Sequence, residues 1–236
     1  GPTRLMGLIA SGAVVVCLGW AGYARNAVWK DGVALWTDAV NRYPGAVFAL
    51  DMRGSALAER GEWAKAIADF DTAIRVNLAY DRAWMNRGFV RYKTGALDAA
   101  LKDFDRAIEL RPDNPLAFNN RGLVLEKMGN VPSAIENYRK ALASERDQFY
   151  RYLFFATLAE ACLRVGDSES AHAAATSSLS LRPGFGRAWR IRAEVRFAGG
   201  DLAGALADAE KAVALLPGDE QSLALRTRIK SLSENP

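Results

Sequence analysis

The chain has 236 residues, of which half are hydrophobic and a quarter charged. This composition is typical of a folded protein and argues against intrinsic disorder. The net charge of +4 comes from scattered Lys and Arg residues, so no nucleic-acid partner is expected. Two cysteines and the single histidine, His172, provide neither a disulfide framework nor a zinc site. Phosphate-binding loops and metalloprotease motifs are absent from the sequence. We therefore expect no catalytic site, no metal and no cofactor.

Residues 5–24 read LMGLIASGAVVVCLGWAGYA and include no charged residue. A helix of this length spans about 30 Å, the thickness of the hydrocarbon layer of a bilayer. We predict a transmembrane helix with a short flank in residues 1–26. A cleaved signal peptide and a buried helix of a soluble bundle are the alternatives. Gly7 and Ser11 have the spacing of close helix contacts in membranes, which suggests membrane subunits as partners. The residues predicted to contact the membrane are Leu5, Ile9, Val15, Leu18, Trp20 and Tyr23.

Residues 27–46 predict an amphipathic helix next to the membrane. Trp29 and Trp36 are seven residues apart and so share a helix face, and Pro44-Gly45 ends the pattern. Trp36, Ala39 and Pro44 also match the second-helix positions of the repeats that follow. We therefore predict the second half of an incomplete repeat, joined to the membrane helix without a flexible linker.

A repeat with a period of 34 residues covers most of the remaining chain. Each copy has a small residue at its eighth position, a glycine at the fifteenth and an alanine at the twentieth. Three copies also have an aromatic residue at the twenty-fourth position, where Ala175 and Ala209 predict thinner packing in the last two. Residues 220–236 predict a capping helix and tail. The five copies are residues 47–80, 81–114, 115–148, 152–185 and 186–219.

These positions resemble the tetratricopeptide-repeat family over residues 47–219. The resemblance implies an all-α, right-handed superhelix of helix-turn-helix repeats that binds proteins in a concave groove lined mainly by the first helix of each repeat. An extended peptide or a helix is the expected ligand. The residues expected in this groove are Asp51, Met52, Arg82, Met85, Asn86, Phe89, Tyr92, Asn119, Asn120, Leu123, Glu126, Lys127, Arg187 and Arg190.

Two groups of polar residues recur within the repeats. Asn86 and Asn120 occupy equivalent positions and could pair with a peptide backbone, as similar asparagine rows suggest in the O-GlcNAc transferase family. Their alternative role is to bridge neighbouring helices. An arginine often precedes the small eighth residue, and we expect its head to reach carboxylates or carbonyls. Asp69 and Asp71 are expected to be solvated. The recurrent arginines are Arg53, Arg87, Arg121 and Arg192.

The junction between the apolar segment and the repeats suggests a second resemblance. It is similar to a motif of bacterial membrane proteins related to the transmembrane-and-TPR O-mannosyltransferases, which implies repeats on the periplasmic or another non-cytoplasmic side. The chain is thus expected to be a membrane-anchored adaptor or the recruiting tail of a larger membrane glycosyltransferase, with a soluble scaffold as a third hypothesis. The matching residues are Arg25, Asn26, Trp29, Asp31, Leu35 and Trp36.

Overall fold

The computed structural model describes residues 31–146 and 148–234. This part of the chain forms twelve α-helices and one short 3₁₀ helix, and it contains no strand. The all-α prediction is therefore confirmed for the described residues. The predicted membrane segment, with its six contact residues, lies outside them. Within the described ranges, no helix is long and apolar enough to cross a membrane.

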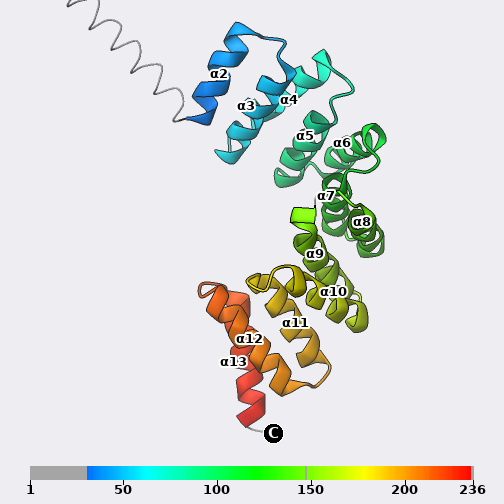
Figure 1. Cartoon of the computed structure of the whole chain (residues 1–236), viewed down its shortest axis with the longest axis vertical. Helices are drawn as coiled ribbons and strands as arrows, with labels where there is room; N and C mark the ends of the chain where they lie inside the picture. The colour runs from blue at the N-terminus through cyan, green and yellow to red at the C-terminus, as the bar shows by residue number, and fades with distance from the viewer. Residues whose placement is uncertain (1–30, 147, 235–236) are drawn as a thin grey trace, which may run out of the picture. The chain divides into compact units, whose positions relative to one another are not determined.

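The described part of the chain divides into two compact units, with the boundary between Thr94 and Gly95. The first unit contains α2 (Gly32–Arg42), α3 (Val47–Glu59), α4 (Trp63–Val76) and α5 (Asp81–Lys93). Each helix packs against its neighbour in the chain, and α3 also contacts α5 (Figure 1). The α3–α5 contact places the first helices of two successive repeats side by side.

The second unit continues the same arrangement. Here too each helix packs on its neighbours in the chain, and the additional contacts join α9 to α11 and α11 to α13. A 3₁₀ helix, η1, lies between the second helix of the third repeat and the first helix of the fourth. The right-handed superhelix predicted for the whole array stays a prediction. The elements are α6 (Leu97–Leu110), α7 (Pro115–Lys127), α8 (Val131–Ala143), η1 (Gln148–Tyr150), α9 (Arg151–Arg164), α10 (Ser168–Leu181), α11 (Gly186–Ala198), α12 (Leu202–Leu215) and α13 (Glu220–Glu234).

Short polar side chains set the start of several helices. The Asp31 carboxylate accepts a hydrogen bond of 3.0 Å from the Val33 amide at the start of α2. Asn114 caps α7 in the same way and is followed by Pro115, whose missing N–H costs nothing in the first turn. These caps satisfy amides that no helical carbonyl can reach.

The turn inside each of the five repeats contains a glycine with a positive φ. The values lie between 76° and 87°, in the left-handed region that a Cβ disfavours. The sequence prediction that this glycine ends the first helix is confirmed. The five glycines are Gly61, Gly95, Gly129, Gly166 and Gly200.

The small eighth residue makes room for the aromatic ring of its own repeat. A Cβ at Gly54 would lie 2.7 Å from Cε1 of Phe70, and one at Gly122 would lie 2.5 Å from Cε1 of Tyr138. Both rings are fully buried. In the fourth repeat Ala159 stands opposite Ala175, and both are also fully buried. Ala209 of the fifth repeat is also completely covered. The thinner packing predicted around these two alanines stays a prediction.

The recurrent arginines pair with carboxylates on the second helices, as predicted. Arg53 donates two hydrogen bonds to Asp69, of 2.7 and 2.6 Å, and Arg192 binds Asp208 in the same way at 2.7 and 2.9 Å. The prediction that Asp69 is solvated was wrong, because only 6% of this residue is exposed. Asp71 is also paired, at 2.5 Å from Arg87. These bonds tie first helices to second helices.

Candidate functional site

We call the first helix of each repeat its A helix; the A helices are α3, α5, α7, α9 and α11. In the first unit, several polar side chains of the A helices converge on Asp51 of α3. Its carboxylate is fully buried, yet it is surrounded by donors. Asn86 donates a hydrogen bond of 2.7 Å, Tyr80 donates one of 3.0 Å, and the Arg82 guanidinium lies 3.1 Å away. A buried carboxylate is tolerated only when it is paired in this way. Asp51 therefore fixes side chains of α5 against α3.

The Tyr80 hydroxyl is strongly perturbed by this environment. Burial, followed by the charge of Asp51 and the hydrogen bond to it, raises the pKa of Tyr80 to about 12. The phenol therefore remains a donor at neutral pH. The Asp51 carboxylate thus keeps its hydrogen bond from Tyr80 at neutral pH.

The second unit repeats this link with different residues. Thr157 on α9 donates a hydrogen bond of 3.1 Å to Asn119 on α7. Asn86 and Thr157 are both the sixth residue of their repeats, and Asp51 and Asn119 are both the fifth. The sixth residue of one repeat thus binds the fifth residue of the preceding repeat in both units. This bond sets the register between adjacent A helices.

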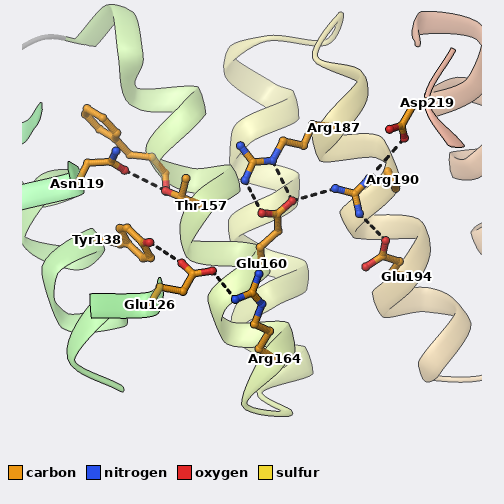
Figure 2. A network of polar contacts seen from close by, with 11 residues as sticks. Asn119, Glu126, Tyr138, Thr157, Glu160, Arg164, Arg187, Arg190, Glu194 and Asp219 are labelled. Carbon is orange, nitrogen blue, oxygen red and sulfur yellow. Dashed lines mark hydrogen bonds and ion pairs between the residues drawn. The ribbon is translucent and has the colours of Figure 1, made fainter. Parts of the chain in front are cut away.

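A larger network of charges connects α9, α11 and the start of α13, as Figure 2 shows. Glu160 accepts two hydrogen bonds from Arg187, including one of 2.8 Å from Nε, and one of 2.9 Å from Arg190. Arg190 also donates to Glu194 at 2.6 Å and lies 3.8 Å from Asp219. Arg190 therefore joins carboxylates from three helices or their caps.

The balance of forces at Glu160 favours the ionised form. Burial alone would raise its pKa, but the hydrogen bonds and charges of Arg187 and Arg190 outweigh burial and lower it. The hydrogen bonds to Glu160 in turn raise the pKa of Arg187. Both partners are therefore charged at neutral pH.

A third set of contacts extends the network toward α7. Glu126 accepts a hydrogen bond of 2.5 Å from the buried Tyr138 hydroxyl and lies 2.8 Å from the Arg164 guanidinium (Figure 2). The Arg164 side chain is 58% exposed, whereas that of Glu126 is 12% exposed. Arg164 and Arg187 are thus held by carboxylates that are more buried than they are.

The predicted groove residues differ in burial. Asp51 and Asn119 are buried and position other side chains. Phe89 and Lys127 are exposed. The structure brings Asn119, Glu126, Arg187 and Arg190 into the region drawn in Figure 2. The remaining predicted residues are half-buried: Met52, Arg82, Met85, Asn86, Tyr92, Asn120 and Leu123.

Sequence reasoning missed several residues of this surface. Glu160 occupies the ninth position of its repeat, equivalent to Phe89 and Leu123, so the repeat register could have identified it. Tyr80 and Arg164 gave no such signal, because their partners lie 29 and 38 residues away in the chain. The side-chain amide of Asn86 donates hydrogen bonds to Asp51 and, more weakly, to Ser55 at 3.4 Å.

This arrangement of paired helices with a glycine turn defines a class of helical repeat proteins. Tetratricopeptide-repeat family models match residues 54–95, 90–129, 116–148 and 156–220. The chain belongs to the tetratricopeptide-repeat family. No protein with a curated description matches it by sequence.

Solved structures with the same fold include a chain of the APC/C hetero-tetramer Cut9–Hcn1, with 18% identity and a TM-score of 0.77. The alignment covers 86% of this chain but 40% of that one. YrrB, described as a TPR protein with an unusual peptide-binding site, gives 17% identity and a TM-score of 0.62 over 81% of this chain and 97% of its own. PilF of Pseudomonas aeruginosa gives 18% identity and a TM-score of 0.73, and the alignment covers 80% of this chain and 85% of PilF. At these identities the similarity shows the fold.

Proposed function

We propose that the chain is a protein-interaction scaffold whose A-helix surfaces bind a partner protein as an extended peptide or a helix. The observation that carries this proposal is the fixed arrangement of polar side chains on these surfaces. Arg82 in the first unit, and Arg187 and Arg190 in the second, are each held by carboxylates of a neighbouring helix or its cap. Side chains that are already ordered lose little entropy when they bind a ligand.

The same surfaces combine charge with exposed aromatic area. Phe89 on α5 is 38% exposed, and Phe48 on α3 is 52% exposed. Mixed aromatic and arginine surfaces are typical of protein interfaces. YrrB, described as binding a peptide, has the same fold. Together these observations favour a protein partner over a small metabolite.

We also propose that residues 5–24 hold this scaffold at a membrane, with the repeats on the non-cytoplasmic side. The support is the uncharged sequence itself, together with the firm attachment of α2 to α3. Asp31 pairs with Arg60, and the Trp36 ring meets the Phe48 ring edge-on at 5.5 Å between centroids. An anchor preceding α2 would thus be followed directly by the repeats. Membrane subunits would be additional partners.

Site-specific photo-crosslinking tests partner binding. We expect a photoreactive residue at Phe89 or Arg187 of the full chain to crosslink one defined protein in cells. The matched control is the same residue at Ala64, which is exposed on α4. Equal yields of the same product at all three positions, or no product at any, would contradict binding on the A-helix surface.

Membrane attachment requires a separate experiment. The chain should remain with membranes in alkaline carbonate and be released by detergent, and replacement of residues 5–24 by a Gly-Ser segment should release it. Release of the intact chain by carbonate alone would favour the soluble scaffold instead. A reporter enzyme fused after Pro236 and active on only one side of the membrane determines the sidedness.

The alternative function is the partner-recruiting region of a larger membrane glycosyltransferase. The junction resemblance favours it, and two of the matching residues, Asp31 and Trp36, make the contacts between α2 and α3 described above. Several further membrane spans encoded upstream of Thr3 would support this alternative. A single span would support the adaptor.

A further inference from the structure

A pocket of about 360 Å³ opens between α3 and α5 in the first unit. Phe70 and Val90 form its floor, since 0% and 1% of these residues are exposed. Trp63 and Phe89 form its walls and remain 37% and 38% exposed. The pocket is therefore lined mainly by aromatic and aliphatic carbon, and its walls are open to solvent.

The exposure of these two walls is costly in an isolated molecule. Burial of a large aromatic side chain is favourable relative to leaving it in water. Phe70, from the same pocket, is completely covered, so the fold can bury aromatic rings nearby. Concave apolar surface that stays open beside ordered polar groups is characteristic of a ligand site.

Two polar side chains at the rim are paired. Ser55 donates to the Asp51 carbonyl at 2.9 Å, and Asn86 donates to Asp51. Glu59 is exposed, lines the pocket, and forms no hydrogen bond or ion pair with the described residues. A free carboxylate at the rim of an apolar pocket attracts a positive charge.

A positive charge lies next to Phe89, one of the walls of the pocket. The Lys93 ammonium on α5 lies 5.3 Å from the centre of the Phe89 ring. A basic ligand group is therefore repelled from the α5 side and attracted to Glu59 on the α3 side. This asymmetry determines where a positive residue of the ligand must lie.

We propose that this pocket takes a bulky apolar side chain of a partner peptide, and that Glu59 pairs with a Lys or Arg one or two residues away in that peptide. The inference rests on the proposed scaffold function and names the sequence pattern that this part of the surface selects. Apolar contact provides most of the affinity, and Glu59 provides the preference for a basic neighbour.

A displayed peptide library tests the pattern directly. Three random positions between Gly-Ser flanks would be selected against the immobilised full chain, dispersed in detergent. The wild type should enrich a large apolar residue next to, or one residue from, Lys or Arg. Glu59→Lys should shift the enriched charge to Asp or Glu, and Phe89→Ala should remove the apolar preference. Glu169→Lys is the matched control, since Glu169 is exposed on α10 and pairs with none of the residues that the structure describes.

The most enriched peptide is then synthesised with a fluorophore and titrated by anisotropy. Glu59→Lys should weaken its binding about fivefold, the range of an exposed ion pair, and the charge-reversed peptide should recover the loss. Such a reversal cannot come from misfolding, and thermal unfolding followed by circular dichroism verifies that Phe89→Ala is folded. Enriched peptides that bind all variants equally would overturn the pocket assignment while leaving the scaffold function intact. If the wild type enriches no sequence, both proposals fail.

Discussion

Gly122 on α7 lies directly against the ring of Tyr138 on α8, and a Cβ on this glycine would stand 2.5 Å from Cε1 of the tyrosine. Tyr138 has no room to retreat, because it is fully buried and its hydroxyl is bonded to Glu126. The interior is packed too densely to absorb an extra methyl group at this distance. The contact explains why this position of the repeat is small.

We predict that Gly122→Ala lowers the free energy of unfolding by up to about 2 kcal/mol. The expected overpacking cost of about 1–3 kcal/mol exceeds the gain in helix propensity of roughly 1 kcal/mol. Urea unfolding followed by circular dichroism measures the change. Gly184→Ala is the control, since a Cβ there has no neighbour within 4 Å. Equal effects of the two substitutions would show that packing against Tyr138 is not the cause.

The buried pair of Arg53 and Asp69 should be strongly coupled. A double-mutant cycle with alanine should give about 2 kcal/mol, because two charge-assisted hydrogen bonds are lost and Asp69 is nearly covered. The exposed pair of Arg42 and Asp38, whose side chains are 58% and 50% exposed, serves as the comparison. Its coupling should not exceed about 0.5 kcal/mol. Similar coupling in both cycles would contradict the difference in burial.

Replacement of Glu160 should have a pH-dependent effect. We expect Glu160→Gln to cost about 2 kcal/mol at pH 7, since Arg187 and Arg190 lose their charged acceptor. The pKa of Glu160 is lowered in the folded chain, so its contribution is complete above the unfolded pKa of about 4.3 and is lost as the pH falls through the folded value. Unfolding measured from pH 7 to pH 3 should show the difference between variant and wild type shrinking at the acid end. A constant difference would be inconsistent with this assignment.

Tyr80 should titrate later than an ordinary tyrosine. Its pKa of about 12 lies above the usual value of 10, so neutral Tyr80 stabilises the fold below pH 10 and this stability is lost between pH 10 and 12. The tyrosinate absorbance of the wild type minus that of Tyr80→Phe isolates this group. Asp51→Asn should move the midpoint downward but leave it above 10, because burial is the largest cause. A midpoint near 10 in the wild type would disprove the burial.

Much of the fold follows from local patterns that the sequence displays openly. The helix pairs are predictable from the 34-residue period. The turns are predictable from the glycine at the fifteenth position, because each turn has a positive φ there and glycine adopts it without strain. The arginine before the eighth residue could likewise be predicted to reach a carboxylate. Which carboxylate it reaches, and that Asp69 is buried rather than solvated, could not be predicted.

The candidate binding surface was harder to predict from the sequence than the fold. Asp51 is a charged residue that was predicted to line the groove, yet it is buried and accepts hydrogen bonds from Tyr80 and Asn86. Glu59, a charged residue that lines the pocket, has nothing distinctive around it in the sequence. These roles could not be predicted because the burial and pairing of a side chain depend on residues about 30 positions away in the chain.

The sequence by itself determined the repeat period, the helix boundaries near their caps and the positions that must stay small, because backbone conformation and helical spacing are local properties. Only the tertiary structure decided that Ala175 is fully covered, that Glu160 joins Arg187 to Arg190, and that Trp63 and Phe89 face an open pocket. Those outcomes depend on how closely neighbouring helices approach. That distance is set by the sum of many side-chain contacts and is not encoded at any single position.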